Sequence, residues 1–329
     1  MSTQAEPILV SVVVPTYRRP QLLERCLQAL LAQDFPADAY EIIVCDDADS
    51  PQTRRQVREL AAAAGGAPAL RYLAATGTRG PAAARNLGWR HARGRIIAFT
   101  DDDTIADPDW LGQGVLALRP GIQAAAGRTD MPIPEIPTDY ERDAAGLTRS
   151  EFITANCFVR RGALEEVGGF DQRYTMAWRE DSDLFFALLE RGMEVVRAPA
   201  ARVLHPLRPA PFAAGLGMQK KVMFDVLLYR KYPRLYRARV RQGPPWFYLS
   251  VALSLVAALA AAAAGYWIAA AVLGGTWLAL TGYFFARRLA GVSHAPWHVA
   301  ELALTSAAIP LLSIGWRLVG AARYGARFP

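Results

Sequence analysis

Three consecutive carboxylates occupy positions 101 to 103, directly after the apolar run Ile96–Thr100. Adjacent carboxylates repel one another, so such a triplet is favoured when a cation lies close by. Side chains alternate along a strand, so Asp101 and Asp103 could share one divalent ion, and Mg²⁺ or Mn²⁺ suits such oxygen ligands. Taken alone, the triplet fits an exposed acidic turn or a helix N-cap before Pro108 equally well.

A second pair of carboxylates, Asp46 and Asp47, also follows an apolar run. Such a pair could accept hydrogen bonds from a nucleobase or a ribose, although a plain turn explains it too. The chain contains neither GxGxxG nor GxxxxGK[ST], the two common glycine-rich phosphate loops. Phosphates would then depend on a metal and on nearby basic groups. Arg79 and Arg85 are the candidates, although each one taken singly is more typical of a solvated helix face.

A third acidic cluster opens an amphipathic helix predicted over residues 178–191. Acids in a first helical turn interact favourably with the helix dipole, which is a common structural reason for them. Alternatively, one of its carboxylates (Glu180, Asp181 or Asp183) could act as a general base that deprotonates an acceptor hydroxyl. His205 follows the strand-like run 195–198. A lone histidine is more often structural than a ligand, so it is a third metal-ligand candidate behind Asp101 and Asp103.

These clusters are positioned by apolar runs that alternate with helix-like segments between residues 8 and 200. This alternation is typical of a mostly parallel sheet covered on both faces. In such sheets ligands bind beyond the carboxyl ends of the strands, and three predicted strands end in polar clusters. We therefore predict a site at that edge. The predicted strands are 8–14, 41–45, 70–73 and 96–100, and the predicted helices are 22–31, 51–64 and 82–92. The first strand should stop at Pro15.

The composition excludes several classes of protein. Of the 329 residues, 52% are hydrophobic and 20% are charged, which excludes a disordered chain. Long polar stretches before residue 240 exclude a polytopic transporter. The three cysteines are too few and too scattered for a disulfide framework or a zinc cluster, so we expect a reducing compartment. The first residues have neither a basic leader nor a long apolar core, so no signal peptide is expected.

The net charge of +7 is concentrated in one stretch of the chain. Between Arg202 and Arg241 there are ten lysines and arginines and one acid, Asp225, which sum to +9 and leave −2 for the remainder. A nucleic-acid-binding protein would spread its basic residues over a soluble face, so nucleic acid is not an expected partner. The segment is also amphipathic, and it could bind anionic lipid head groups or act only as a topology signal.

Residues 242–286 contain no charged side chain, a run of 45 residues. One membrane crossing needs about 20 apolar residues, so we predict two crossings, 246–264 and 266–285, with Gly265 at the turn. A buried hairpin in a soluble protein is the alternative. Basic residues flank the run on both sides, so the positive-inside rule places both flanks in the cytoplasm. A third apolar stretch, 298–316, contains Glu301 and Pro310, and we expect an interfacial or re-entrant helix there.

Taken together, these motifs resemble the family 2 glycosyltransferases, which have the GT-A fold of nucleotide-diphospho-sugar transferases. The resemblance covers roughly residues 8 to 205 and depends on the order and spacing of its motifs. It implies an α/β, Rossmann-like fold with a mostly parallel central sheet, followed by C-terminal transmembrane helices, of the membrane-anchored bacterial type. The matching segments are 12–18 (VVVPTYR), 41–47 (EIIVCDD), 80–88 with Ala84-Arg85-Asn86, 99–103 (FTDDD), 168–171 (GGFD) and Glu180-Asp181.

The resemblance assigns roles to the matching positions. The nucleotide-sugar would be bound by Pro15, Thr16, Tyr17, Arg18, Asp46, Asp47, Arg79, Arg85, Asp101 and Asp102. Of these, Asp47 with Asp46 beside it would contact the base. Asp101 and Asp103 would form the Asp-x-Asp pair, one near the ribose and one on a Mg²⁺ or Mn²⁺ ion. Asp181 would be the catalytic base of an inverting reaction, with Glu180 beside it.

Two departures from the family pattern bear on these roles. Family members often have Asp-Asp-Gly-Ser after the second strand, whereas this chain has Asp46-Asp47-Ala48-Asp49-Ser50 and lacks the glycine. The Gln-x-x-Arg-Trp motif of processive synthases is also absent, and the nearest segment, 217–221, reads GMQKK. We therefore expect transfer of one sugar per acceptor rather than processive synthesis.

Four parts of the chain are predicted: a cytoplasmic GT-A domain (1–208), a basic amphipathic juxtamembrane segment (209–242), a transmembrane hairpin (243–288) and an interfacial or re-entrant helix (289–329). The predicted reaction moves one sugar to a lipid-linked or membrane-proximal hydroxyl at the inner membrane, in cell-envelope polysaccharide or glycolipid synthesis. A polyprenyl-phosphate glycosyltransferase and a non-catalytic nucleotide-sugar-binding scaffold are the alternatives. Retention of Asp101, Asp103 and Asp181 in order argues against the scaffold.

Overall fold

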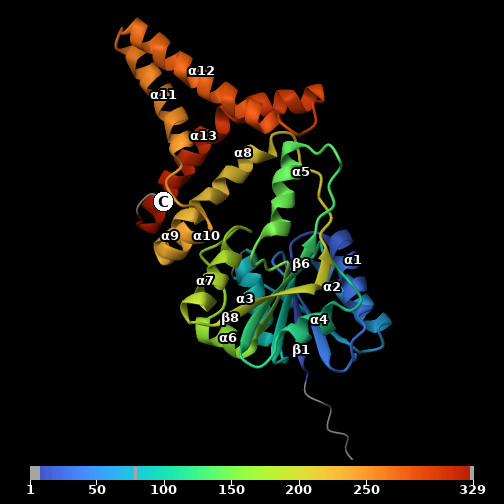
Figure 1. Ribbon diagram of the computed structural model, residues 1–329. Helices are drawn as coiled ribbons and strands as arrows, with labels where there is room; N and C mark the ends of the chain where they lie inside the picture. The colour runs from blue at the N-terminus through green and yellow to red at the C-terminus, as the bar shows by residue number, and fades with distance from the viewer. Residues whose placement is uncertain (1–7, 78–79, 327–329) are drawn as a thin grey trace, which may run out of the picture. The chain divides into compact units, whose positions relative to one another are not determined.

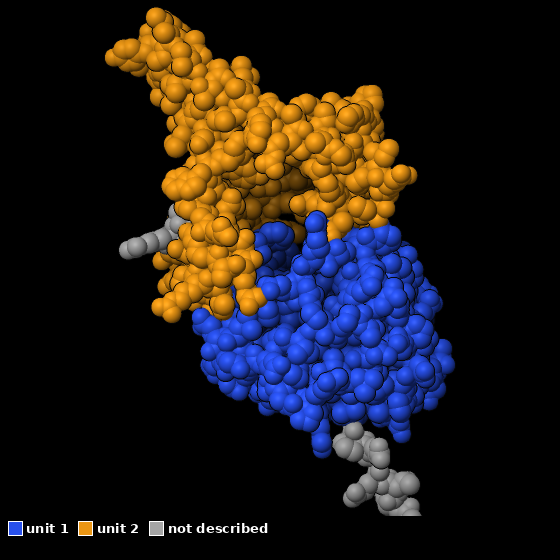
Figure 2. Space-filling view, in the orientation of Figure 1, with its two compact units in different colours: residues 1–132, 146–206 blue, residues 133–145, 207–329 orange. Residues whose placement is uncertain are grey.

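The computed structural model describes residues 8–77 and 80–326. The chain divides into two compact units, coloured separately in Figure 2. Residues 1–132 and 146–206 form the sheet unit, and residues 133–145 and 207–329 form the helical unit. The short segment 133–145 thus belongs to the helical unit although its neighbours on both sides along the chain belong to the sheet unit. The domain boundaries expected near 208, 242 and 288 stay predictions.

The sheet unit is built around eight strands in the order β3-β2-β1-β4-β7-β6-β8-β5. Figure 1 labels β1, β6 and β8 of this sheet. Its first four strands pair in parallel, and each connection between consecutive ones contains a helix, as parallel pairing requires. These elements are β1 (Val10–Thr16), α1 (Pro20–Leu31), β2 (Tyr40–Asp46), α2 (Pro51–Ala63), β3 (Ala69–Ala74), α3 (Pro81–His91) and β4 (Ile96–Thr100). They match the predicted elements to within about two residues, which is the usual uncertainty of element ends.

The other half of the sheet is mixed, because β7 is antiparallel to both β4 and β6, whereas β6 is parallel to β8. Strands β5, β6 and β7 were not predicted from the sequence. The segment of β6 is rich in alanine, which has little preference for strands. The elements are β5 (Ile105–Ala106), α4 (Trp110–Ala117), β6 (Ile122–Asp130), η1 (Ala145–Arg149), β7 (Asn156–Arg160), α6 (Arg161–Val167), α7 (Glu180–Glu190) and β8 (Glu194–Leu204).

The first strand continues through Pro15 to Thr16, so the prediction that it stops at Pro15 was wrong. Proline cannot donate a ladder hydrogen bond and is tolerated where one side of a strand lacks a partner. β1 pairs with β2 along its whole length, but its register with β4 runs only from Val10 to Val13. Pro15 therefore lies beyond the β4 ladder. The continued strand sets Thr16 opposite Asp46.

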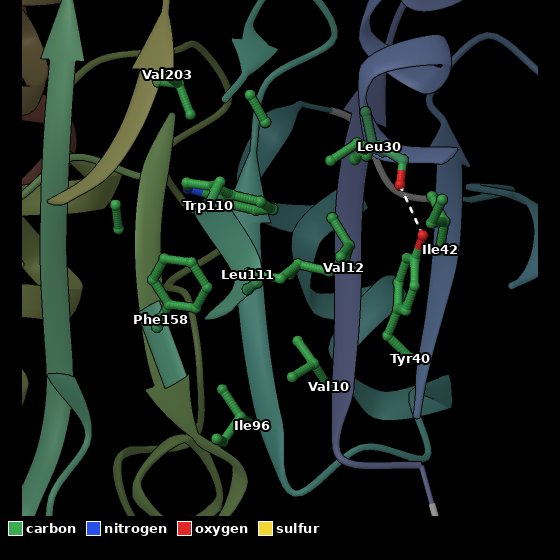
Figure 3. Close-up of a cluster of buried hydrophobic side chains, with 14 of the residues drawn as sticks. Val10, Val12, Leu30, Tyr40, Ile42, Ile96, Trp110, Leu111, Phe158 and Val203 are labelled. Carbon is green, nitrogen blue, oxygen red and sulfur yellow. Dashed lines mark hydrogen bonds between the residues drawn. The ribbon is translucent and has the colours of Figure 1, made fainter. Parts of the chain in front are cut away.

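An apolar core holds the strands in register (Figure 3). Val10 and Val12 of β1 and Ile42 of β2 are completely buried in it. The buried hydroxyl of Tyr40 donates to the carbonyl of Leu30 over 2.9 Å, which ties β2 to α1. Burial of each aliphatic side chain is worth roughly 1.5–3 kcal/mol, and one-residue slips would turn these side chains out of the core. The carboxyl ends of β1, β2 and β4 are thereby aligned.

Three helices of the helical unit are long and apolar enough to cross a membrane, by length and composition. α11 (Trp246–Ala263) and α12 (Trp267–Leu289) match the predicted hairpin, and Gly265 between them has a φ of +82°. α13 (Pro296–Tyr324) is longer than the predicted stretch. Shorter helices complete the unit: α5 (Asp139–Ala144), α8 (Ala214–Met218), η2 (Gln219–Val222), α9 (Met223–Lys231) and α10 (Pro233–Arg239).

Candidate active site

The carboxyl ends of β1, β2 and β4 meet at one edge of the sheet, because these strands are adjacent and parallel. Asp102, which follows β4, connects two of them. Its Oδ2 accepts a hydrogen bond from the Thr16 hydroxyl over 2.7 Å, and its Oδ1 lies 3.2 Å from Nη1 of Arg19. Burial raises the pKa of Asp102 to about 6, against the lowering effects of Thr16 and Arg19. Asp102 thus holds the β1 end in place, and its contact with a donor stays a prediction.

Asp101, Asp103 and His205 form a cluster in which each offers one ligand atom within 4.8 Å of the others. Nε2 of His205 lies 3.4 Å from Oδ1 of Asp103. The register of a short antiparallel pair explains this proximity, because Ile105 stands opposite Leu204, the residue before His205. The first and third carboxylates of the triplet thus converge. They lie beyond the end of β4, with a turn at Asp102 and Asp103, so the turn and not strand alternation brings them together.

This cluster fits a divalent cation. Two carboxylates and an imidazole are donors that Mn²⁺ and related ions accept, and carboxylates suit Mg²⁺. Asp103 and His205 are buried, so their polar atoms are largely withdrawn from water. Within residues 8–77 and 80–326, Nδ1 of His205 is buried without a hydrogen-bond partner. A buried polar group without a protein partner is costly, and a cation bound at Nδ1 itself would supply the missing partner.

Arg85 links this cluster to the helix α7. Its Nη2 donates to Oδ1 of Asp101 over 2.7 Å, and its Nη1 donates to Oε1 of Glu180 over 3.1 Å. The side chain is only 3% exposed, so the interpretation of Arg85 as a solvated helix-face residue was wrong. A buried guanidinium is tolerated when it is paired and hydrogen-bonded, and these two carboxylates provide that pairing. Arg85 therefore positions both carboxylates.

The first turn of α7 carries Glu180 and Asp181. Oδ1 of Asp181 accepts from the backbone N–H of Ser182 over 2.6 Å and from its hydroxyl over 3.3 Å. Burial raises the pKa of both carboxyl groups above the ordinary range, although Arg85 acts in the opposite direction. A carboxylate with a raised pKa is a stronger base, so this turn can accept a proton from a hydroxyl.

Asp46 organises the loop after β2. The side chain is completely buried, and it accepts from the backbone N–H groups of Ala48 and Ser50 and from the Tyr72 hydroxyl over 2.8–3.0 Å. The backbone of this loop takes a left-handed conformation at Asp49, where φ is +46°. Aspartate is among the residues that tolerate this region. The missing glycine therefore does not prevent the loop from closing, and the contact of Asp46 with a base stays a prediction.

The remaining predicted donor residues flank this loop. Oδ2 of Asp47 accepts from the backbone N–H of Gly80 over 2.8 Å and so ties the β2 loop to the start of α3. Pro15 is buried within β1, whereas Tyr17 is half exposed, with the guanidinium of Arg18 at 5.3 Å from its ring centroid. Arg79 lies outside the described residues. The predicted roles of these residues are untested.

Two positioning residues were missed by the sequence analysis. One is Arg19, which pairs with Asp102. The other is Asn86, whose amide donates to the carbonyl of Phe170 over 2.8 Å and whose Oδ1 accepts from the Phe170 N–H over 2.9 Å. At Gly169 a Cβ would lie 2.6 Å from this Oδ1, and φ is +74°, so only glycine fits. The signal for Asn86 in the sequence was the pair of motifs Arg85-Asn86 and Gly-Gly-Phe-Asp. In the structure these two motifs contact each other through Asn86 and Phe170.

Comparison with protein families gives two overlapping matches. The profile of Glycosyl transferase family 2 matches residues 11–170, and that of Glycosyl transferase family group 2 matches residues 139–314. Together they cover the sheet, the candidate site and most of the apolar helices.

Individual relatives and solved structures agree with these matches. Glycosyltransferase AglE of Haloferax volcanii is 27% identical over 68% of this chain and 77% of its own length. Validoxylamine A glucosyltransferase of Streptomyces hygroscopicus is 27% identical over 56% of this chain, which spans only 52% of that protein. The mannosyltransferase PcManGT of Pyrobaculum calidifontis, solved with GDP-Man and Mn²⁺, has a TM-score of 0.55 at 24% identity, with 92% and 89% of the two chains covered. That likeness concerns the fold.

Proposed function

We propose that this chain, which belongs to the family 2 glycosyltransferases, moves one sugar from a nucleotide-diphospho-sugar to a lipid-linked or membrane-proximal hydroxyl. The transfer would invert the configuration at the anomeric carbon. The observation that carries the proposal is the bridge made by Arg85. It joins Asp101, at the candidate cation site, to Glu180, the neighbour of the proposed base Asp181. The residues that would bind the donor diphosphate and those that would deprotonate the acceptor hydroxyl thus belong to one connected network.

The chain's own residues account for binding and proton transfer. Asp47 and Tyr17 would contact the nucleotide beside the ends of β1 and β2, where Tyr17 is half exposed and Asp47 is partly buried. Asp181, deprotonated, would take the proton of the acceptor hydroxyl as that oxygen attacks the anomeric carbon. Asp101, Asp103 and His205 would hold a divalent cation. Such a cation, when bound, stabilises the negative charge that develops on the leaving diphosphate.

The named ligands of similar proteins support a nucleotide-sugar donor. PcManGT was solved with GDP-Man and Mn²⁺, and TarS of Staphylococcus aureus was solved with UDP. A 33% identical segment of 97 residues matches the Escherichia coli enzyme WfgD, named as a glucosyltransferase acting on GlcNAc-diphosphoundecaprenol. A lipid-linked acceptor agrees with the apolar helices α11 and α12. We place the catalytic residues on the cytoplasmic face of the inner membrane, because basic residues flank those helices.

A thermal-shift screen of full-length protein in detergent tests the proposed donor. The ligands are UDP-, GDP- and dTDP-sugars, each with and without Mn²⁺. A ligand that binds only the folded state raises its stability, by about 2.7 kcal/mol at a hundred times its dissociation constant. We expect one nucleotide to raise the melting temperature in a Mn²⁺-dependent way. If none does, the proposed nucleotide-sugar donor is wrong, and a membrane scaffold that binds no nucleotide becomes the better account of the fold. In a separate transfer assay, activity with polyprenyl phosphate alone would identify the other alternative.

Arg85→Gln is expected to lower kcat/KM roughly tenfold to a hundredfold, which is typical for residues that orient metal ligands. The substitution removes both ion pairs, so Asp101 and Glu180 lose the group that orients them. Arg85→Lys should recover only part of the loss, because one ammonium group cannot bridge two carboxylates as a planar guanidinium does. The measurement is kcat and KM for the donor at fixed Mn²⁺.

Arg90→Gln on the exposed face of the same helix is the matched control, and it should leave both constants unchanged. Equal losses in Arg85→Gln and Arg90→Gln would show a general effect on α3 rather than positioning. Full activity of Arg85→Gln in folded protein would refute the bridge.

A further inference from the structure

The helix α13 has two unlike faces. Buried residues recur at helical spacing along one face and include His298, Ser306, Ser313 and Arg317. The other face exposes large apolar side chains, with Leu304 at 50% and Leu318 at 58%. A helix that crosses the membrane in a bundle and a helix that lies on the membrane surface can both turn their polar residues towards protein. The contacts of its two ends decide how α13 meets the membrane.

The first end of α13 is attached to the segment 133–145. Nε2 of His298 accepts from the backbone N–H of Asp139 over 3.1 Å, and the N–H of Ser293 donates to the carbonyl of Pro137 over 2.8 Å. This segment leaves the sheet unit and returns to it within 13 residues, which is too short to cross a membrane twice. The first end of α13 is therefore on the same side of the membrane as the sheet unit.

The end of α12 is attached to the same segment. Nη2 of Arg288 lies 2.8 Å from Oδ2 of Asp139, and Arg288 also donates to the hydroxyls of Thr305 and Ser306. The chain that leaves α12 therefore emerges on the sheet-unit side. Because α11 begins after a stretch without a crossing helix among the described residues, α11 and α12 form a hairpin with Gly265 on the far side.

The last turns of α13 are attached to α9. Nη2 of Arg317 lies 3.2 Å from Oδ2 of Asp225, and both side chains are about 5% exposed. At Gly320 a Cβ would lie 2.7 Å from the carbonyl oxygen of Met223, so the two backbones touch. α9 precedes the first apolar helix of the described chain, which starts at Trp246. The second end of α13 is thus on the sheet-unit side as well.

We propose that α13 lies in the plane of the membrane surface, with its exposed apolar face among the acyl chains of one phospholipid leaflet, and that among the helices of residues 8–77 and 80–326 only α11 and α12 cross. A helix of 29 residues is about 43 Å long, and it runs unbroken through Pro310, so it cannot enter the bilayer and turn back. Two crossings return the chain to its starting side, which agrees with the contacts at both ends of α13. The inference concerns topology and does not depend on sugar transfer.

Labelling of one introduced cysteine per variant with a membrane-impermeant maleimide tests on which side of the membrane the ends of α12 and α13 lie. The variants of the full-length protein are Ala264→Cys, Ala290→Cys and Ala326→Cys, in right-side-out and inside-out vesicles. Wild-type protein is the unlabelled control, because its three cysteines are buried. We expect Ala264→Cys to react from one face only, and the other two variants to react only from the opposite face. Reaction of either of those two from the face of Ala264→Cys would overturn the proposal.

Depth measurements with nitroxide labels test the contact with lipid. Leu304→Cys and Leu318→Cys lie on the same face, 14 residues apart, so a crossing α13 would separate them by about 21 Å in depth. In vesicles of phosphatidylcholine and phosphatidylglycerol we expect both labels at one depth, with high accessibility to oxygen. The pair Ile268→Cys and Leu278→Cys on α12 is the control, and its depths should differ. Unequal depths on α13, or accessibility to aqueous nickel reagents at both positions, would contradict the proposal. Neither assay requires catalysis, so a failed transfer assay would leave this result intact.

Discussion

Asp181→Asn should reduce kcat by about a thousandfold and leave donor binding unchanged, because general base catalysis typically contributes 10²–10⁴-fold. The substitution preserves the shape of the side chain, and an asparagine Oδ1 can still accept the hydrogen bonds that Ser182 donates. It removes the only function that an amide cannot perform, the uptake of a proton. The measurement is single-turnover transfer to an acceptor, together with the Mn²⁺-dependent thermal shift caused by the donor.

Asp183→Asn is the matched control for this experiment. Asp183 lies in the same turn of α7 and accepts from the Tyr174 hydroxyl over 3.1 Å, which an asparagine oxygen can also do. We expect its kcat to stay close to that of the wild type. If Asp181→Asn keeps near-normal turnover, another group accepts the proton and the assignment of the base is wrong.

We expect the rate of the wild-type enzyme to depend on pH because the carboxyl group of Asp181 is buried. Asp181 works as a base only when it is deprotonated, and desolvation raises its pKa above the ordinary aspartate value. The rate should therefore fall as the pH drops through this raised pKa, so the acid limb should lie above the range of an exposed aspartate. In Asp181→Asn the residual rate should lack this limb.

Asp103→Ala should abolish the Mn²⁺-dependent binding of the donor and lower kcat/KM by at least about a hundredfold. Loss of a residue that only orients a metal ligand already costs 10–100-fold, and Asp103 would itself be a ligand. Its carboxylate is buried beside His205, so no water-exposed acid can easily replace it. The measurement is the thermal shift of the donor over a titration of Mn²⁺.

Asp107→Asn provides the control for Asp103→Ala. Asp107 belongs to the same acidic segment, but its side chain is 40% exposed and lies 3.7 Å from Arg202. Its substitution should leave the Mn²⁺ titration unchanged, because exposed ion pairs contribute little. An unaltered titration in Asp103→Ala would show that the cluster does not bind the ion.

The elements that carry the acidic groups could be predicted from the sequence, because their signals are local. Apolar runs of strand length precede Asp46 and Asp101, and parallel strands necessarily place their carboxyl ends at one edge. The charge-free run of 45 residues likewise predicts the hairpin by length alone. β6 was missed because such a local signal is weak there: the alanines of Ile122–Asp130 show neither the alternation nor the β-branched side chains of a typical strand.

The partners of the site residues were decided only by the tertiary structure. Arg85 is 95 residues from Glu180 in the sequence, and its helical surroundings alone suggested a solvated side chain. His205 joins Asp103 because Leu204 pairs with Ile105, a register that no local pattern encodes. Such contacts depend on which faces of distant elements pack together.

For the membrane segments too, the sequence determines one part of the structure and the tertiary contacts decide another. Composition determines that α11, α12 and α13 can each enter lipid, and it assigns similar hydropathy to all three. A long apolar helix has the same composition whether it crosses a bilayer or lies along it. Glu301 and Pro310 already favour an interfacial or re-entrant helix. The tertiary contacts of His298 and Arg317, which attach the ends of α13 to the segment 133–145 and to α9, support the proposal that it lies along the surface.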